Sequence, residues 1–409
     1  MRICLITTAT TLHSMGGTEI QAEALAAEAA RQGHKVFILT SAHPGGEHAH
    51  QKDGYTVVHI PGTHFSMSRK WVKRWEQELP RAAAALEKKE AIDIFWAENF
   101  SGLPYAALPR KDRAPLISIV NGLAIKGEIA SNFAAVSNPK ELLYFLTGYA
   151  GQVLFYYIPW FKALARDSDL IAAVSRETAA ALEEELPDSR GKIEIVYNPV
   201  NCGLFKPDTG LKRQVGAGLG LSSSAVGVMM SGVLHPQKGM HLGLAAFALA
   251  AQKFPAARLL IAGDGPQRAY LEKTARQLGL AGRAIFCGMK PNAEMPGLYN
   301  AADIYLNPTL RREGLGIVNL EAMACGLPCV ISKIGGTGST IDDGVSGYFT
   351  RPGDIAGMAE KISRLLGDPA LREKMGGEGR KKAETVFEKS AVVGRYIAAS
   401  EKLLSGPGR

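Results

Sequence analysis

Short apolar runs alternate with amphipathic stretches along the whole chain, and this alternation predicts strands separated by helices. In the first half, apolar runs predict strands at Arg2–Thr7, Lys35–Thr40, Ile92–Trp96, Leu116–Val120 and Leu170–Val174. Apolar residues at helical spacing predict helices at Thr18–Gln32 and Glu177–Glu185. The first half therefore has the pattern of an α/β domain with a largely parallel sheet.

The same alternation resumes after residue 225. Strands are predicted at Val226–Ser231, Arg258–Ala262, Ala284–Cys287, Asp303–Leu306 and Pro328–Ser332, and helices at Met240–Phe254, Pro266–Leu278, Gly316–Cys325 and Ile355–Leu366. Between the two halves, Lys206–Ser224 is rich in glycine, serine and charge, which favours an interdomain linker. We therefore expect two Rossmann-like α/β domains facing across a cleft, with the first spanning residues 1–205 and the second residues 206–390.

Composition places the chain among ordinary globular proteins, because 46% of its residues are hydrophobic and 21% are charged. The net charge of +8 is uneven: residues 1–200 hold 21 Lys and Arg against 22 Asp and Glu, which leaves 26 against 17 for the rest. The second half shows no basic helix or nucleic-acid motif. We expect an anionic small ligand or a membrane surface rather than a nucleic acid as the partner of this charge.

The five cysteines are scattered, odd in number and without C-x-x-C spacing, so they favour reduced thiols over disulfides or a zinc site. The start of the chain, residues 1–8, has a strand-like pattern and lacks the long apolar core of a signal peptide. We expect a cytoplasmic protein.

A double glycine, Gly16-Gly17, stands between the first predicted strand and helix. There it can let backbone N–H groups approach a phosphate, although an ordinary tight turn has the same sequence. Thr18 and Gln21 have the spacing of a capping box, and Gly33 is placed to end the helix. No Walker motif is present and no dinucleotide fingerprint is complete, so ATPase and NAD-dependent dehydrogenase functions lose their support.

The segment from residue 308 to 328 carries the strongest chemical signal. A strand ends near residue 306, a glycine-containing loop follows with Glu313, and a helix begins near Gly316 with Glu321 among apolar residues. A carboxylate in apolar surroundings needs hydrogen-bond donors, and a sugar or ribose diol offers two of them. The N–H groups of residues 315–317 (Leu315, Gly316 and Ile317) are predicted at a helix N-terminus, which favours phosphate.

The spacing Glu313-x7-Glu321, followed by Ala-Met-Ala-Cys-Gly-Leu-Pro, resembles the signature of family 4 retaining glycosyltransferases of the GT-B fold. Weaker matches lie along nearly the whole chain: Gly16-Gly17-Thr18-Glu19, Ala173-Val174-Ser175, Tyr197-Asn198-Pro199-Val200-Asn201 with Phe205, Lys238-Gly239, Gly263-Asp264-Gly265-Pro266, Gly335-Gly336 and Asp343-Gly344-Val345-Ser346-Gly347.

This resemblance implies a nucleotide-diphosphate sugar, linked to UDP or GDP, in the C-terminal domain and an acceptor mainly on the N-terminal domain. It implies no required metal or other cofactor, a role in building cell-envelope glycans, and a final helix at about residues 391–404 that crosses back onto the first domain. Its donor-site roles fall on Glu321 for the ribose, Glu313 and Gly314 for the sugar, Lys238 for the diphosphate, and the backbone of Gly16 and Gly17.

The chain departs from the family pattern at three places. Gly232-Val233 stands where the family commonly has Gly-Arg, so His235, Arg311 or Arg312 would have to hold the diphosphate. Asn121 stands where the family has a cleft histidine; it can hydrogen-bond a sugar but cannot act as a base. Ser339 replaces a glutamate. These departures leave open a nucleotide-sugar-binding protein without catalysis, or a GT-B enzyme of another class such as an epimerase or phosphorylase.

One acidic residue is expected on the acceptor side. Glu98 follows the strand predicted at Ile92–Trp96 and would face the cleft, where it is our candidate for positioning the acceptor or handling its proton; the alternative is an exposed loop acid.

Two segments suggest a membrane surface. Arg69–Leu79 has tryptophans on one helical face and basic residues beside it, which fits either an interfacial helix on an anionic membrane or a packed surface helix. Leu142–Phe161 has no formal charge over 20 residues and is rich in aromatics. It fits a hydrophobic surface for a lipid-linked acceptor or a buried core helix better than a membrane span, because its glycines, proline and tyrosines suit a span poorly.

Overall fold

The computed structural model describes residues 1–14, 16–66, 68–133 and 139–406, and it divides into two compact units. Unit 1 comprises Met1–Glu128, Leu143–Pro199 and Lys389–Arg409, and unit 2 comprises Ile129–Leu142 and Val200–Glu388. The chain leaves unit 1 after Pro199, a few residues before the boundary predicted at residue 205.

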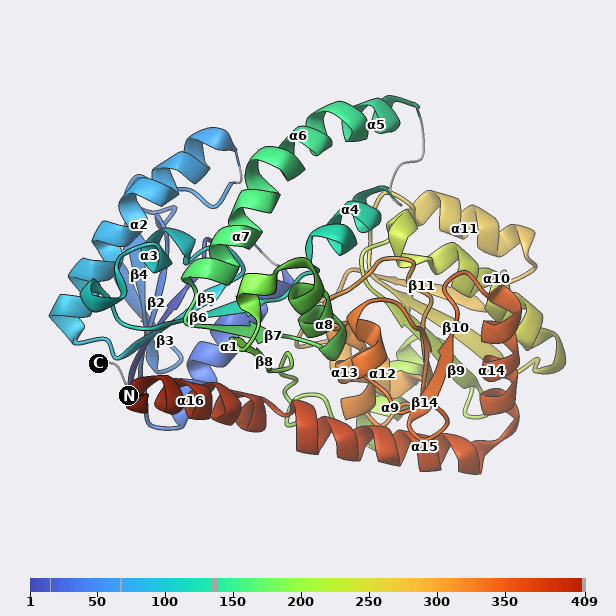
Figure 1. The fold of residues 1–409 in the computed structure, drawn as a ribbon. Coiled ribbons are helices and arrows are strands. Elements are labelled where there is room, and N and C mark those ends of the chain that lie inside the picture. Colours follow the sequence, from blue (N-terminus) through green and yellow to red (C-terminus); the bar gives the residue numbers. More distant parts are fainter. Residues whose placement is uncertain (15, 67, 134–138, 407–409) are drawn as a thin grey trace. The chain divides into compact units, whose positions relative to one another are not determined.

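Unit 1 is built on an eight-stranded sheet in the order β3-β4-β2-β1-β5-β6-β7-β8 (Figure 1). All neighbouring strands are parallel except β3, which runs antiparallel to β4. The strands are β1 Arg2–Ile6, β2 Lys35–Ser41, β3 Ala49–Lys52, β4 Tyr55–Ile60, β5 Ile94–Glu98, β6 Leu116–Val120, β7 Leu170–Ala173 and β8 Ile193–Ile195.

The helices between these strands are α1 Gly17–Arg31, α2 Arg69–Glu90, α3 Leu103–Ala106, α4 Ile125–Phe133, α5 Pro139–Tyr144, α6 Ala150–Gln152, α7 Ile158–Asp167 and α8 Arg176–Glu185. Helices α4 and α5 are shared between the units, because Ile129–Leu142 belong to unit 2. Helix α1 does not have the predicted capping box. It begins at Gly17 with Gly16 as N-cap, and no side chain caps it. The prediction for its other end is confirmed, since Gly33 has φ +88° and follows the C-cap residue.

Unit 2 is built on a six-stranded parallel sheet in the order β11-β10-β9-β12-β13-β14. Its strands are β9 Val226–Ser231, β10 Ala257–Ala262, β11 Ala284–Gly288, β12 Ile304–Asn307, β13 Cys329–Ser332 and β14 Gly347–Thr350. This is the Rossmann order, in which the strand sequence reverses between β9 and β12. Ligands of such sheets bind beyond the carboxyl ends of the strands at that reversal.

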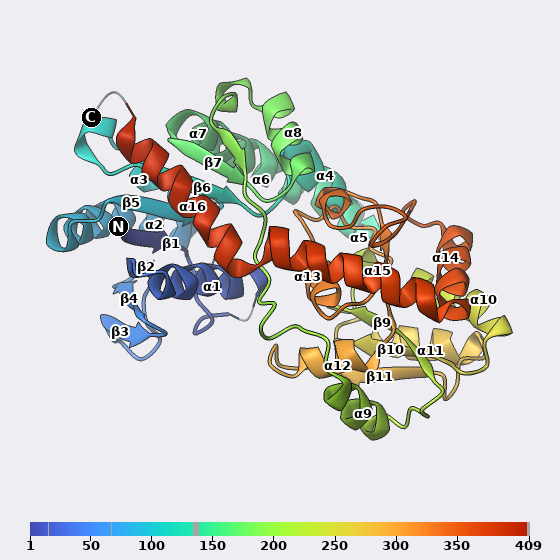
Figure 2. The same ribbon diagram turned by 90° about the horizontal axis from the view of Figure 1, so that it is seen from below.

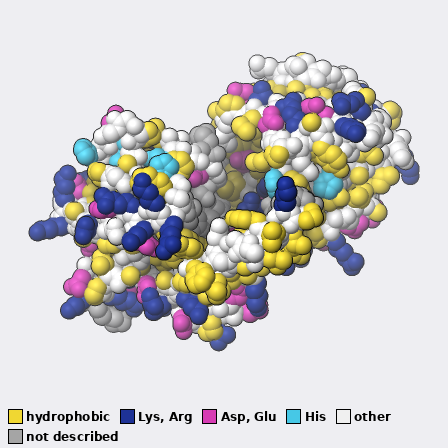
Figure 3. Space-filling model, turned by 90° about the horizontal axis from the view of Figure 1, so that it is seen from above, with side chains coloured by type: hydrophobic (Ala, Val, Ile, Leu, Met, Phe, Trp, Pro, Cys, Tyr) yellow, Lys and Arg dark blue, Asp and Glu magenta, His cyan; other side chains and the backbone are white. Residues whose placement is uncertain are grey.

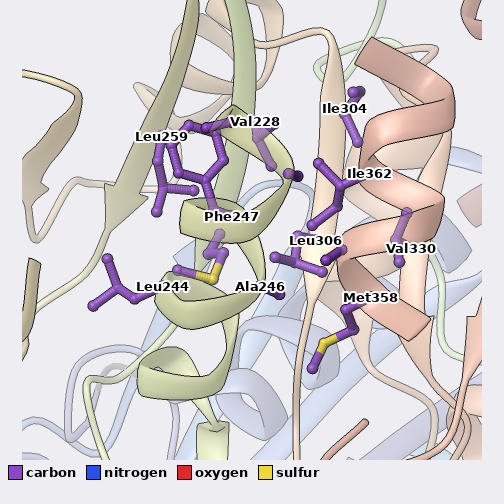
Figure 4. Packing of buried hydrophobic residues seen from close by; sticks show 14 of the residues in the cluster. Val228, Leu244, Ala246, Phe247, Leu259, Ile304, Leu306, Val330, Met358 and Ile362 are labelled. Carbon is purple, nitrogen blue, oxygen red and sulfur yellow. The ribbon is translucent and has the colours of Figure 1, made fainter. Parts of the chain in front are cut away.

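The helices of unit 2 are α9 Thr209–Gly218, α10 Met240–Ala250, α11 Arg268–Gln277, α12 Met295–Ala301, α13 Ile317–Ala324, α14 Ile355–Gly367 and α15 Pro369–Lys382. Apolar side chains from α10 and α14 pack on the strands, among them Phe247 and Ile362 against Val228, Leu306 and neighbouring residues (Figure 4). This cluster of buried residues fixes the strands whose ends carry the loops described below.

The prediction that Lys206–Ser224 is a linker is wrong, because this stretch contains helix α9 within unit 2. Asp208 caps the helix by accepting the N–H groups of Gly210 and Leu211. Glycine and serine at its ends gave the segment its linker-like composition.

The last helix, α16 Lys389–Ser405, belongs to unit 1, as predicted from the family resemblance. It lies beside α1 in both ribbon views (Figure 2). Trp96 of β5 donates its indole N–H to the Ser400 hydroxyl at 3.0 Å, so the helix is bonded to the centre of the first sheet.

Candidate functional site

Two loops meet at the reversal point of the unit 2 sheet, one after β9 and one after β12. Lys238 ends a short 3-10 helix that follows β9, and Gly239 follows with φ +64°. A Cβ atom on Gly239 would lie 2.0 Å from the carbonyl oxygen of Pro308, so glycine is required for this close approach. The backbone oxygen of Gln237 accepts the N–H groups of Leu310 and Arg311 at 2.9 and 3.0 Å. These contacts hold the two loops together.

The Lys238 ammonium group pairs with the Glu313 carboxylate across this junction. Their Nζ and Oε1 atoms are 2.6 Å apart, and the side chains are 24% and 11% exposed. The Glu313 backbone is fixed as well, because its carbonyl oxygen accepts the Gly336 N–H at 2.7 Å. The loop therefore presents a cation that can bind an anion next to a carboxylate that can accept hydroxyl protons.

Glycine also brings the start of α13 against this carboxylate. Gly316 is the N-cap of the helix with φ +89°, and a Cβ atom there would lie 3.1 Å from Oε2 of Glu313. Gly314 and Ile317 are half-buried, while Leu315 and Gly316 are buried. The helix begins at Ile317, so Leu315 and Gly316 precede its first turn.

Glu321 lies one turn further along α13 and is half-buried. Burial raises the pKa of its carboxyl group to about 7, against the lowering effect of a hydrogen bond from the Tyr299 hydroxyl. That bond joins the Tyr299 hydroxyl and Oε2 at 2.8 Å. The Ser231 hydroxyl, at the end of β9, lies 3.1 Å from the Tyr299 hydroxyl and 2.9 Å from that of Tyr305. A hydroxyl network thus holds Glu321 toward the end of the sheet.

Val233, which stands near Lys238 where the family commonly has an arginine, is 56% exposed and does not point into the protein. His235 is half-buried as the N-cap of the 3-10 helix. Arg311 and Arg312 are exposed on the loop that is bonded to Gln237, which keeps them as candidates for holding a phosphate.

A separate polar group lies at the carboxyl end of the unit 1 sheet. Asn121, after β6, donates its amide to Oε2 of Glu98 and accepts the amide of Asn198 at 3.1 Å. Asn198 also donates to Gln21 of α1. The amide of Asn121 is therefore fixed at both its nitrogen and its oxygen.

The prediction that Glu98 faces an open cleft is wrong. Strand β5 extends through Glu98, which pairs with Ile119 in the sheet and is only 3% exposed. Burial raises the pKa of its carboxyl group to about 8, although the hydrogen bond from Asn121 opposes the shift. A neutral, buried carboxyl group can orient Asn121 through the hydrogen bond that it accepts from that amide.

The predicted site residues thus fall into two groups. Lys238, Glu313 and the residues from Gly314 to Glu321 come together in unit 2, while Glu98 and Asn121 come together in unit 1. Gly16 and Gly17 open α1 of unit 1. Tyr299 could not be predicted, because a helical tyrosine carries no local signal. Gln21 was named only as a helix-capping residue and Asn198 only as part of a family match.

The two predicted membrane segments differ in the structure. On α2, Trp75 and Leu79 are buried, and Trp75 donates its indole N–H to the Ser101 carbonyl at 2.8 Å. The interfacial alternative for Arg69–Leu79 is therefore wrong for this face, which packs on the sheet. None of the helices among the described residues is long and apolar enough to cross a bilayer.

The segment Leu142–Phe161 exposes many of its large apolar side chains and buries others. Its exposed members are Leu142, Leu143, Tyr144, Leu146, Leu154 and Phe155, while Tyr149, Val153 and Phe161 are buried. Hydrophobic side chains gather on the face that Figure 3 shows. An apolar surface of this kind commonly marks an interaction site.

Two family models match the chain in succession. Residues 15–204 match the model "Glycosyltransferase Family 4", and residues 220–382 match the model "Glycosyl transferases group 1". Together they cover most of both units.

Relatives and solved structures agree with these models. An uncharacterised glycosyltransferase of Methanocaldococcus jannaschii is 26% identical over 95% of this chain and 94% of its own length. A GDP-mannose-dependent alpha-(1-6)-phosphatidylinositol monomannoside mannosyltransferase of Mycolicibacterium smegmatis is 31% identical over 54% of this chain and 58% of its own. The structure of HepE from Anabaena in complex with UDP superimposes with a TM-score of 0.74 at 19% identity, covering 98% of this chain and 100% of HepE.

Proposed function

The chain belongs to glycosyltransferase family 4 and has the GT-B fold, and from this premise we propose that it transfers a sugar from a nucleotide-diphosphate sugar to a glycan or lipid-linked acceptor. Transfer retains the configuration at the anomeric carbon and needs no metal ion at the donor site. The observation that carries this proposal is the Lys238–Glu313 pair at the reversal point of the unit 2 sheet.

Lys238 would neutralise the diphosphate. Negative charge grows on this leaving group as the glycosidic bond breaks, and a preorganised cation stabilises it more in the transition state than in the ground state. Glu313, held beside the lysine, would accept hydroxyl protons of the donor sugar. The lysine lies between two anionic groups in this arrangement, which keeps the sugar-binding carboxylate from repelling the phosphate.

Glu321 would hold the ribose. Oε2 accepts the Tyr299 hydroxyl, and the carboxylate retains acceptor capacity for ribose hydroxyl donors. Because these donors stabilise the charged form, nucleotide binding should lower the pKa of Glu321 from about 7. Nucleotide affinity should consequently weaken as the pH falls below about 7 and the free carboxyl group takes up a proton.

The test measures nucleotide binding and sugar turnover separately. UDP, GDP and ADP and their common sugar conjugates are titrated into wild type, Glu321→Gln and Lys238→Ala by calorimetry between pH 6 and 8. We expect one base to be preferred, and Glu321→Gln to remove most of the affinity and its pH dependence. Lys238→Ala should reduce turnover by about 10²–10³, the usual cost of removing one transition-state donor.

Lys212→Ala is the matched control. Lys212 also forms a close ion pair in unit 2, with Asp303, but on the surface of α9. Its loss should leave binding and turnover unchanged. If Lys238→Ala binds and turns over like wild type, the proposed donor site is wrong.

Binding without turnover has one observation in its favour, namely the exposed Val233 where the family places a phosphate-binding arginine. Arg311→Ala and Arg312→Ala separate the two functions. Loss of turnover in one of these variants would support an arginine of the longer loop as the replacement, while nucleotide binding with no turnover on any acceptor would support a nucleotide-sugar-binding protein.

We place the acceptor on unit 1 and its apolar part on Leu142–Phe161, which supports a protein working peripherally at the cytoplasmic membrane face. Co-sedimentation with vesicles of anionic and of neutral phospholipid tests this. Replacing the exposed Leu143, Leu146 and Phe155 by serine should abolish vesicle binding, whereas serine at the exposed Leu278 of unit 2 should not. Equal sedimentation of all variants would remove the membrane from the proposal and leave a soluble glycan as acceptor.

A further inference from the structure

Three histidines that the glycosyltransferase chemistry does not use converge at one edge of unit 1. His43 lies in the loop after β2, His50 in β3 and His59 in β4. One ring nitrogen from each can be chosen so that all three lie within 4.8 Å of one another. Figure 3 shows histidine side chains, in cyan, on the surface of this unit.

His59 is held in the tautomer that a metal site needs. Its Nδ1 lies 2.8 Å from the carbonyl oxygen of Ser41, and because a carbonyl can only accept, Nδ1 carries the proton. The lone pair of a neutral ring is then on Nε2. A backbone carbonyl that orients a histidine through its other nitrogen is the usual outer support of a metal ligand.

His50 completes the geometry on one side. Its Nδ1 lies 3.3 Å from Nε2 of His59. Two imidazole nitrogens bound to the same tetrahedral Zn²⁺ at about 2.0–2.1 Å are about 3.3–3.4 Å apart, so this pair already has the spacing of two ligands. Without a metal, the same spacing is a hydrogen bond in which His50 donates.

His43 is the ligand that has to adjust. Its Nδ1 accepts the Gly45 N–H at 2.9 Å. A neutral ring that binds a metal either offers Nδ1 to the ion or carries its proton there, so coordination replaces this bond in both cases. The residue lies in a turn with two glycines, Gly45 and Gly46, whose backbone can change conformation at a small cost in free energy.

His13 is close to the cluster but is already engaged. Its Nδ1 accepts the Thr10 N–H at 3.1 Å, and its Nε2 lies 3.1 Å from the Ala42 carbonyl, which it must donate to. Both nitrogens are used by the backbone. His13 therefore packs beside the cluster without being a ligand, and His43, His50 and His59 are the three candidate ligands.

We propose that His43, His50 and His59 bind one late first-row divalent ion, Zn²⁺ foremost, with a fourth position open to water. Three neutral imidazoles suit this class of ion, and three protein ligands leave the coordination sphere incomplete. The ion would tie the β3–β4 hairpin to the loop after β2. The site lies in unit 1, whereas Lys238 and Glu313 belong to unit 2, and it goes beyond the proposed function, which needs no metal at the donor site.

The test uses the full chain without a histidine tag, stripped of metal with a chelator. Zn²⁺ is titrated against a competing chromophoric chelator, and Co²⁺ is added separately as a spectroscopic probe. We expect one Zn²⁺ per chain and visible Co²⁺ bands of a four-coordinate site without thiolate charge-transfer absorption. His43→Ala and His50→Ala should each weaken Zn²⁺ binding by about 100-fold or more. Loss of a direct ligand should cost at least as much affinity as loss of a residue that only supports a ligand, for which about 10–100-fold is usual.

His48→Ala is the matched control. His48 is exposed in the same loop and lies outside the cluster, so its loss should leave the affinity unchanged. Circular dichroism checks that the variants fold. Both ligand variants replace half-buried side chains, and the buried His59 is left unchanged because its loss could destabilise the fold. The proposal is overturned if wild type binds no Zn²⁺ at micromolar concentration, or if the ligand variants bind as tightly as wild type. It is also overturned if Cys287→Ser removes the binding, because the ligand would then be Cys287, the one cysteine of the five that is not buried. The pair His50–His59 is then a hydrogen bond only.

Discussion

Glu98 shows how one residue's surroundings decide its chemistry. Glu98 ends β5, the strand between β1 and β6, and its buried carboxyl group lies beside Asn121 and close to the buried Tyr396. With a pKa of about 8 it is mostly protonated at neutral pH. It is thus a neutral hydrogen-bonding group that orients Asn121, where the sequence had suggested an acid facing the acceptor.

This raised pKa predicts a pH dependence of stability. Between about pH 4.5 and 8 the unfolded chain has lost the Glu98 proton while the folded chain keeps it, so the free energy of unfolding contributed by this group falls as the pH rises. The slope is at most about 1.4 kcal/mol per pH unit. Glu98→Gln removes it, so the variant should gain stability relative to wild type from pH 5 to pH 8.

Urea unfolding followed by tryptophan fluorescence measures this effect. All four tryptophans (Trp71, Trp75, Trp96 and Trp160) belong to unit 1, so the signal reports the unit that contains Glu98. Glu184→Gln is the control, because the pKa of this exposed residue is lowered by Lys126 and its loss should act weakly in the opposite direction. A constant difference between Glu98→Gln and wild type across the range would contradict the buried neutral carboxyl group.

The charged groups of unit 2 could be predicted from the sequence better than those of unit 1. Lys238, Glu313 and Glu321 were named from short motifs, and the structure places the first two in direct contact. The burial of Glu98 could not be predicted because the apolar run appeared to end at Trp96. The strand continues for two more residues because β6 provides Ile119 as the pairing partner of Glu98. This pairing depends on the tertiary structure and leaves no local pattern in the sequence.

At the scale of elements, the unit 2 loops depend on glycines that allow close backbone approach. Gly239 combines φ +64° with a Cβ position 2.0 Å from the Pro308 carbonyl oxygen. Gly239→Ala should therefore cost about 1–2 kcal/mol for the left-handed backbone, and more for separating the β9 and β12 loops. Because these loops carry Lys238 and Glu313, we expect turnover to be lost even where the protein remains folded.

Gly279→Ala isolates the backbone contribution. Gly279 has φ +71°, but a Cβ atom there meets nothing within 4 Å. This variant should lose about 1–2 kcal/mol of stability and keep its turnover. Thermal unfolding and a turnover assay on both variants check the prediction; equal turnover in both would show that the loop contact does not position the site.

The strands predicted from apolar runs are present in the structure, whereas β3, β4, β8 and β14 were not predicted. Strands β6 and β9 have the predicted bounds, and the other predicted strands agree within about two residues. The β3–β4 hairpin was missed, although Asp53-Gly54 is a favoured hairpin turn, because β3 consists of Ala, His, Gln and Lys. That omission also hid two of the three clustered histidines.

At the scale of the whole molecule, the C-terminal segment of the chain returns to unit 1 and forms part of it. The chain leaves this unit after Pro199 and returns at Lys389, and next to these points Val200 donates its N–H to the Phe387 carbonyl at 2.8 Å. Helix α16 then buries Val392, Val393, Tyr396 and Ala399. The family resemblance predicted this return, whereas no local pattern in the sequence states which unit a terminal helix joins.

This arrangement predicts that damage to α16 acts on unit 1 although it follows unit 2 in sequence. Tyr396 is fully buried, with its ring 5.2 Å from that of Trp96. Tyr396→Ala should leave a cavity and cost about 3–5 kcal/mol. Hydrogen exchange should accelerate at the amides of β1 and β5, while those of β9 and β12 keep their protection.

Tyr396→Phe separates packing from hydrogen bonding. The Tyr396 hydroxyl is buried and finds no hydrogen-bond partner in the described part of the chain, so removing it should leave exchange unchanged or slower. Equal acceleration in both units after Tyr396→Ala would mean that the two sheets unfold as one cooperative body. Acceleration confined to β1 and β5 would establish that the C-terminal helix is an integral part of the N-terminal sheet domain, because only a direct packing partner of that sheet can lower its stability alone.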